Sequence, residues 1–276
     1  MMANVKKALA NKGFVVGGCI FLAIALIALV GPLVWTVNPN AQEMALRLSA
    51  PSPVHPFGCD DFGRDLLARV IVGARVSLGV GIAVTLATSA LGLVIGAYAC
   101  YNERLDHILM RICDGLMSIP GVLLAIALMA MMGASVWNVI IALSIVYTPS
   151  MARIVRSRAM VVKEEPFVEA LRVQGASTAR IVWLHIMPNV MAPFLVQATF
   201  VFAEAVLSEA ALSFLGLGIK APDASWGNIL QAGKNVMRKA WWMIFFPAAA
   251  IIASVLSLNL AGDGLRDALD PKTKED

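Results

Sequence analysis

Long stretches without a charged residue alternate with short polar segments along this chain. Charge is absent from residues 14–37, 76–101 and 115–152, and two further mainly apolar stretches lie at 189–217 and 240–262. A helix of about 20 apolar residues crosses the hydrocarbon core of a bilayer. The pattern therefore predicts an all-α integral membrane protein.

The stretch at 115–152 is too long for one membrane span. A single helix of its 38 residues would extend about 57 Å, whereas the hydrocarbon core is about 30 Å thick. Gly133, Ala134 and Ser135 form a turn signal near its middle, so we expect two spans that meet there. The chain then has six transmembrane helices.

Lysine and arginine residues are unevenly divided between the two sides that six spans define. Fourteen lie in the termini and in the segments 102–111 and 153–185, and eight lie in 38–75 and 217–239. These two residue types are enriched on the cytoplasmic side of membrane proteins. Both termini are therefore expected in the cytoplasm, and 102–111 is interpreted as a short charged loop.

We divide the chain into two parts on this basis. Residues 1–75 hold the first transmembrane helix and a periplasmic segment. Residues 76–276 hold a five-helix core, a cytoplasmic hairpin at 165–189 and a C-terminal tail. A secretory signal peptide at 14–37 is not favoured, because the apolar region is too long and no small-residue cleavage site follows it.

The hairpin interrupts the chain between the fourth and fifth spans. Pro166 favours a first helical turn, and Gly175 can adopt the positive φ that ends a helix. Ser177 or Thr178 is expected to cap a second helix, which stops at Pro188. A short exposed helix of this kind can bind in a groove on another protein.

The amino-acid composition supports a membrane protein and gives no support for a soluble domain, a nucleic-acid-binding protein or an enzyme. The chain is 59% hydrophobic and 14% charged, with a mean hydropathy of +0.78, whereas soluble domains carry about 25% charged residues. A net charge of +4 without basic, aromatic-rich patches does not suggest nucleic acid binding. No nucleotide-binding loop, catalytic motif or metal-ligand spacing occurs, so we expect no cofactor, no metal and no catalysis in this chain.

Two glutamates lie within the fifth predicted span. Glu204 is about 15 residues from the start of that span, near the middle of the bilayer, where a charge costs ~2.5–3.5 kcal/mol. It should therefore face a polar cavity or a partner. Glu209 follows five residues later, so the two side chains do not share a helix face. Both are candidate pathway residues; the alternative is a protonated or hydrogen-bonded carboxyl that joins helices.

The hairpin resembles the EAA loop of ABC-importer permeases. That loop has the pattern Glu-Ala-Ala, three residues, Gly, then nine residues and Ile-x-Leu-Pro. The residues that match in type and spacing are Glu169, Ala170, Gly175 and Pro188. Leu171 replaces the second alanine, and the residues from His185 to Asn189 look like the HILPN form of the peptide/nickel branch.

Other stretches resemble the C-type subunits of dipeptide, oligopeptide and nickel importers. They are 55–65, 73–78, 213–218 with Pro222 and Trp226-Gly227, and the C-terminal 258–271. Cys59 departs from the threonine that is usual at its position. With the hairpin, these stretches extend the resemblance over nearly the whole chain.

The resemblance implies a type I importer permease fold in the bacterial inner membrane. It implies four partners besides the lipid bilayer: a second related permease, two cytoplasmic ATPases that bind ATP and Mg²⁺, and a periplasmic substrate-binding protein. The hairpin would be the coupling helix that sits in an ATPase groove. The coupling positions carried over are Glu169, Ala170, Gly175, Ala176 and Pro188.

The expected function is ATP-driven import of dipeptides or oligopeptides, with nickel or a nickel chelate as the alternative substrate within the family. A proton-coupled secondary transporter that uses Glu204 is the alternative of another class, and a scaffold without a transport role is the third. Secondary transporters have no need of an exposed hairpin, and six helices without an internal repeat is small for that class.

Overall fold

The computed structural model describes residues 9–269, and this part of the chain is helical without β-strands, which confirms the all-α class there. The longer helices are α2 (Lys12–Val34), α3 (Leu66–Tyr101), α4 (Glu103–Met117), α5 (Gly121–Met132), α6 (Val136–Lys163), α9 (Met187–Phe214) and α11 (Trp242–Leu269). The shorter ones are η1 (Met44–Leu46), α7 (Pro166–Val173), α8 (Thr178–Arg180), η2 (Ile181–Ile186) and α10 (Trp226–Gly233). The end of the C-terminal stretch 258–271 lies outside the described residues.

Five helices of the described chain are long and apolar enough to cross a membrane: α2, α3, α6, the continuous helix Thr178–Phe214, and α11. A sixth span results if α4 and α5 count as one, although they meet at an angle of 89°. The prediction of an unbroken third span starting near residue 115 is therefore wrong. Helix α5 has 12 residues and reaches only about 18 Å.

Pro120 explains the break between α4 and α5. It stands just before α5 with ψ at 127°, and proline disfavours helical backbone at the residue before it, Ile119. The turn expected after α5 is confirmed. Gly133 ends α5 with φ at +82°, and the Ser135 side chain caps α6 by accepting a hydrogen bond from the N–H of Asn138.

Helix α3 begins at Leu66, before the charge-free stretch at 76–101 from which the second span was predicted. The Asp65 side chain caps α3 by accepting a 2.7 Å hydrogen bond from an N–H group of the first turn. Arg69 and Arg75 lie inside α3, and both donate hydrogen bonds to backbone carbonyl groups, Arg69 to Pro39 in the preceding segment and Arg75 to Ala28 and Leu29 of α2. Because these guanidinium groups have partners, they do not end the helix.

Residues 102–111 are also helical apart from Asn102, which corrects the interpretation of a charged loop. They form most of α4, whose Asp106 is buried and accepts two hydrogen bonds from Arg156 of α6. Asp114, near the end of α4, accepts another from Arg153. The charges of this segment therefore fasten α4 to α6.

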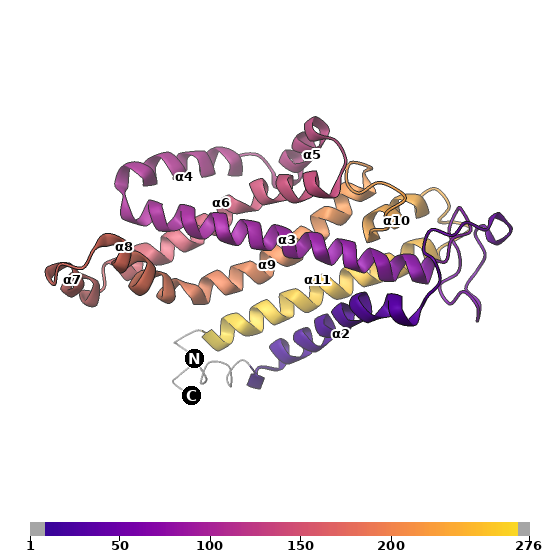
Figure 1. The fold of residues 1–276 in the computed structure, drawn as a ribbon, viewed down its shortest axis with the longest axis horizontal. Helices are drawn as coiled ribbons and strands as arrows, with labels where there is room; N and C mark the ends of the chain where they lie inside the picture. Colours follow the sequence, from indigo (N-terminus) through magenta and orange to yellow (C-terminus); the bar gives the residue numbers. More distant parts are fainter. Residues whose placement is uncertain (1–8, 270–276) are drawn as a thin grey trace.

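The long helices lie side by side, with α3 packed on α6, and α11 packed on both α2 and α9 (Figure 1). The start of α2, the end of α11 and the short helices α7 and α8 lie at one end of the molecule, here called the hairpin end. The segment before α3 and helix α10 lie at the opposite end, here called the α10 end.

Close approach of α3 and α6 depends on Gly92. A Cβ atom there would lie 2.4 Å from Cγ of Met151 and 3.1 Å from the backbone nitrogen of Ala152. We expect Gly92→Val to lower the free energy of unfolding by about 1–3 kcal/mol, the usual cost of overpacking a core. Gly79→Val is the matched control, since nothing lies within 4 Å of a Cβ at Gly79 of the same helix. Thermal unfolding in detergent measures both, and equal midpoints would contradict the prediction.

Candidate functional site: the hairpin and the exposed face of α9

The hairpin begins with α7, and backbone hydrogen bonds close its turn. Pro166 lies in the first turn of α7, as expected, and Gly175 follows the helix with φ at +77°. The N–H groups of Gly175 and Ala176 donate 3.0 Å hydrogen bonds to the carbonyl oxygens of Arg172 and Leu171 respectively. This pair of bonds is the Schellman cap, which needs the positive φ that glycine adopts without strain.

One face of α7 is fixed to the helical bundle. Val168 is fully buried in a cluster that includes Ile181 and Val182 of η2 and Val155 and Ala159 of α6. Burial of an aliphatic side chain of this size contributes about 1.5–3 kcal/mol. The cluster therefore packs α7 against the bundle.

Two polar contacts also join the hairpin end of α3 to this region. The Lys163 ammonium group, at the end of α6, donates a 2.9 Å hydrogen bond to the carbonyl oxygen of Cys100. The hydroxyl of Tyr101, the last residue of α3, contacts the hydroxyl of Thr178 in α8. The end of α3 is thereby joined both to the end of α6 and to the second helix of the hairpin.

The other face of α7 is apolar and exposed. Phe167 is 43% exposed and Val173 is 85% exposed, and Ala170 is exposed between them. Glu169 is the acidic residue of the first turn and is also exposed. An apolar surface held in place in this way is typical of a site for a protein partner.

The second helix of the hairpin does not stop at Pro188, which corrects the prediction. Helix α8 runs through the π-helical turn η2 directly into α9, in one helix of 37 residues. Pro188 lies in the first turn of α9, and it has no N–H group to donate to the preceding turn. The wider π turn just before it accommodates the missing bond, so Pro188 marks the joint between hairpin and span.

The exposed side of α9 carries a stripe of polar residues. At 3.6 residues per turn, Asn189, Gln197, Glu204 and Ser208 fall within an arc of about 100°. Glu204 is exposed, and Gln197 and Ser208 are half-buried. Tyr147 of α6 borders the stripe, with its hydroxyl 2.7 Å from that of Ser208. An exposed acidic side chain within a membrane-spanning helix is unfavourable in lipid, so the stripe is suited to water or to another protein.

Glu209 lies on a different side of α9 from Glu204, as the spacing predicted. Its fully buried carboxylate accepts 2.7 Å hydrogen bonds from the hydroxyls of Ser77 in α3 and Ser213. The Ser77 hydroxyl in turn accepts a 3.3 Å hydrogen bond from the N–H of Trp226 in α10. Glu209 therefore joins three helices at the α10 end and does not reach the exposed stripe.

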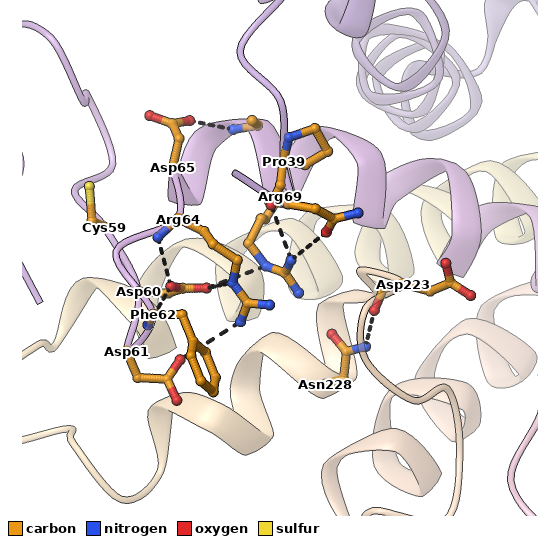
Figure 2. Close-up of polar contacts among 12 residues, drawn as sticks. Pro39, Cys59, Asp60, Asp61, Phe62, Arg64, Asp65, Arg69, Asp223 and Asn228 are labelled. Carbon is orange, nitrogen blue, oxygen red and sulfur yellow. Dashed lines mark hydrogen bonds and ion pairs between the residues drawn. The ribbon is translucent and has the colours of Figure 1, made fainter. Parts of the chain in front are cut away.

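The polar loop before α3 forms a compact cluster at the α10 end (Figure 2). Asp60 is buried, and its carboxylate accepts a 2.6 Å hydrogen bond from Nε of Arg64 and lies 3.5 Å from Nε of Arg69. Asp65 lies 2.8 Å from the imidazole of His55 while it caps α3. The contacts give this sequence stretch a structural role in fixing the start of α3.

Acid–base properties in this loop agree with a structural role. Burial, with the nearby carboxylates of Asp65 and Asp60, raises the pKa of the Cys59 thiol to about 11. Burial, followed by the Asp60 carboxylate, also raises the pKa of the Asp61 carboxyl. A thiol of this kind is neutral at physiological pH and a poor nucleophile or metal ligand. In residues 9–269 no group of three potential ligands is placed to hold a metal.

Sequence reasoning missed the ion pairs that hold α4 on α6. One signal was present: Asn102 is followed by acidic residues in the next turn, which is a helix-start pattern. The structure shows the Asn102 side chain accepting hydrogen bonds from the N–H groups of Arg104 and Leu105. By contrast, Arg153 and Arg156 could be identified as the partners of Asp114 and Asp106 only once the packing of α4 on α6 was known.

Comparison with known families gives two matches that together span most of the chain. Residues 88–275 match the binding-protein-dependent transport system inner membrane component, and residues 5–51 match the N-terminal transmembrane domain of oligopeptide transport permease C. The first match alone covers more than half of the chain and includes the hairpin and α9.

Curated relatives are similar over nearly their whole length. A putative peptide transport system permease protein of Brucella abortus is 45% identical, over 99% of this chain and 93% of its own. The dipeptide transport system permease protein DppC of Alkalihalophilus pseudofirmus is 43% identical, and the oligopeptide transport system permease protein OppC of Bacillus subtilis is 38% identical. Both of these alignments cover 96% of this chain and 87% of the relative.

A solved structure supports the fold. The inward-facing MetNI methionine ABC transporter contains a chain that is 19% identical, with a TM-score of 0.60 over 73% of this chain and 96% of that one. The relatives and the apolar helices place this protein in a bacterial inner membrane. The chain belongs to the inner membrane components of binding-protein-dependent transport systems, in the branch of C-type permease subunits of peptide ABC transporters.

Proposed function

We propose that this chain is one of two permease subunits of an ATP-driven importer of dipeptides or oligopeptides, and that α7 is the helix through which ATPase movements reach the membrane. The observation that carries the proposal is the two-sided character of α7. Val168 anchors one face in the bundle, while Phe167, Ala170 and Val173 leave the other face apolar and exposed.

Binding of this face in an ATPase groove would be stabilised by the burial of its apolar side chains. Full burial of Phe167 and Val173 would contribute about 1.5–3 kcal/mol each. Glu169 lies at the rim of the face, where a basic group of the ATPase can pair with it. Val168 of α7 shares a hydrophobic cluster with residues of α3, α6 and η2, so in this proposal a groove that moves α7 also moves these helices.

The proposed orientation places the hairpin end, with both termini, in the cytoplasm. By analogy with the family, the proposed transporter has three other kinds of component. They are a second permease beside this one, two ATPases that hold ATP and Mg²⁺, and a periplasmic binding protein at the α10 end. In this proposal the chain itself binds no cofactor. Peptides are the proposed substrate because the curated relatives named above are peptide permeases.

Co-purification tests the assembly. The tagged chain is expressed with its neighbouring genes, extracted in mild detergent and analysed by mass spectrometry. We expect a second permease and ATPase subunits to be recovered, and to be lost from a variant in which Phe167 and Val173 are replaced by aspartate. Phe62→Asp, at the α10 end, is the control for an exposed aromatic that lies outside the hairpin. ATPase recovery that is unchanged in the hairpin variant would contradict the proposal.

Glu204 is the proposed pathway residue, and Glu209 is retained only as a structural group. We expect Glu204→Gln to reduce peptide uptake roughly tenfold, because a hydrogen bond to a charged group contributes ~1.5–3 kcal/mol. Uptake of labelled peptide by cells or vesicles measures the effect. Glu43→Gln, an exposed glutamate in the segment before α3, is the matched control. Full uptake in Glu204→Gln would exclude a role for an ionised carboxylate.

A further inference from the structure

A cavity of about 680 Å³ opens between α6, α9 and α11 in the half of the molecule that contains the hairpin. Its floor is mainly apolar and includes Pro193, Val196 and Phe200 of α9. Gly262 lets α11 pack closely on α9 next to Phe200, since a Cβ there would be 2.4 Å from the Thr199 hydroxyl and 3.5 Å from the Phe200 ring. The cavity is large enough for a small peptide and not only for water.

Two guanidinium groups line this cavity from helices that are distant in the sequence. Arg158 belongs to α6 and Arg266 to the last turn of α11, and both are exposed. Within residues 9–269 neither takes part in a salt bridge, whereas Arg153 and Arg156 on the same α6 are paired with carboxylates. Two unpaired guanidinium groups above an apolar floor favour a ligand that carries an anionic group.

The cavity continues the polar stripe of α9. Asn189 and Gln197, which belong to the stripe, also line the cavity, and Glu204 follows Gln197 by two turns on the same face. Because an exposed glutamate within a membrane-spanning helix is unfavourable against lipid, this face borders an aqueous path or a second chain. The cavity is therefore continuous with the face of α9 that carries Glu204, the proposed pathway residue.

We propose that this cavity is a substrate site at the hairpin end of the pathway, where Arg158 and Arg266 bind the terminal carboxylate of a peptide. The proposal rests on the function proposed above and adds which chemical group is recognised in the permease. A carboxylate accepts paired N–H donors from guanidinium in a fixed geometry. Side-chain amides such as that of Gln197 can bond the peptide backbone, and the apolar floor suits peptide side chains of varied shape.

The order of charges along the path gives the site a direction. Glu204 lies two helical turns beyond Gln197 towards the α10 end, and the arginines lie nearer the hairpin end. A peptide whose carboxylate meets the arginines leaves its ammonium group on the side of Glu204. An anionic phospholipid headgroup would use the same arginines, but it would require the stripe to face lipid, which Glu204 disfavours.

Uptake by the complete transporter in proteoliposomes tests the proposal. The probes are one labelled tripeptide with a free C-terminal carboxylate and the same tripeptide as its C-terminal amide. The variants are Arg158→Gln, Arg266→Gln and the double change. Arg104→Gln, an exposed arginine of α4 outside the cavity, is the control. The same binding protein delivers both peptides to every variant, so its own preference cancels when the acid-to-amide ratios are compared.

We expect the double variant to lower the acid-to-amide uptake ratio roughly tenfold relative to wild type, which corresponds to 1.4 kcal/mol. Arg104→Gln should leave the ratio unchanged. An unchanged ratio in the double variant, with ATP-dependent uptake intact in wild type, would overturn this inference alone. Absence of ATP-dependent uptake in wild type would overturn the proposed function and this inference with it.

Bound lipid is measured on the same preparations by native mass spectrometry. Anionic phospholipid that is held by wild type and lost from the double variant, with no change in the uptake ratio, would assign the cavity to lipid and overturn the inference. Equal lipid content with the expected change in ratio supports the peptide assignment.

Discussion

Replacing Gly175 by leucine is expected to abolish peptide uptake while ATP hydrolysis by the assembled complex continues. A side chain at φ +77° strains the backbone by roughly 1–2 kcal/mol, and relief of that strain breaks the bonds that Gly175 and Ala176 donate to the end of α7. Nothing lies within 4 Å of a Cβ at Gly175, so a steric clash does not contribute. The change therefore acts on the angle of α7 rather than on the packing of the bundle.

The measurement is the ratio of peptide imported to ATP hydrolysed, determined on one reconstituted preparation. Gly133→Leu is the matched control, because Gly133 also has a positive φ, of +82°, and also has nothing within 4 Å of a Cβ. With ψ at 164°, Gly133 lies in a backbone region that is essentially restricted to glycine, so Gly133→Leu places strong backbone strain at the turn between α5 and α6, away from the hairpin. A ratio that falls at least tenfold in Gly175→Leu and much less in Gly133→Leu is expected. Equal losses would mean that the hairpin has no special part in coupling.

Replacing Glu209 by alanine is expected to lower the free energy of unfolding by about 3 kcal/mol. The change leaves a cavity and removes the acceptor for the buried hydroxyls of Ser77 and Ser213. Glu209→Gln keeps the shape and one acceptor, so we expect less than half of that loss. Since Ser77 also holds Trp226, the alanine variant should loosen α10 first.

Thermal unfolding of the detergent-purified chain measures the stability of these variants, and protease sensitivity of the α10 region reports the local loosening. Glu204→Ala is the control on the same helix. Glu204 is exposed and lacks a side-chain hydrogen bond within the described residues, so we expect a change within about 0.5 kcal/mol. A Glu209→Ala variant as stable as Glu204→Ala would contradict the structural assignment of Glu209.

The apolar stretches and the hairpin were predictable because single residues control them. Pro166 and Gly175 have one dominant backbone preference each, and both lie where the structure needs that preference. The separation of Glu204 and Glu209 onto different faces followed from helix geometry alone. These features are local, so they can be predicted without knowledge of the packing.

The remaining errors arose where a neighbouring turn or a distant partner changes the preference of a single residue. Arg69 and Arg75 suggested a polar segment, yet their bonds to backbone carbonyls allow α3 to begin at Leu66. Pro188 suggested a helix end, yet the π turn η2 carries the helix through it. Glu209 is fully buried and Arg158 is exposed. This difference depends on how α3, α9 and α11 pack, which the sequence alone does not give.

Energy coupling is the central claim, and uptake by sealed vesicles that contain the purified complex tests it most directly. Labelled peptide and its binding protein are supplied on the α10 side, and the hairpin side receives either ATP with Mg²⁺ or a proton gradient without nucleotide. We predict uptake with ATP, no uptake with the gradient alone, and loss of the ATP-driven uptake in Gly175→Leu. Uptake driven by the proton gradient without ATP, and lost in Glu204→Gln, would contradict the account and identify a proton-coupled carrier instead.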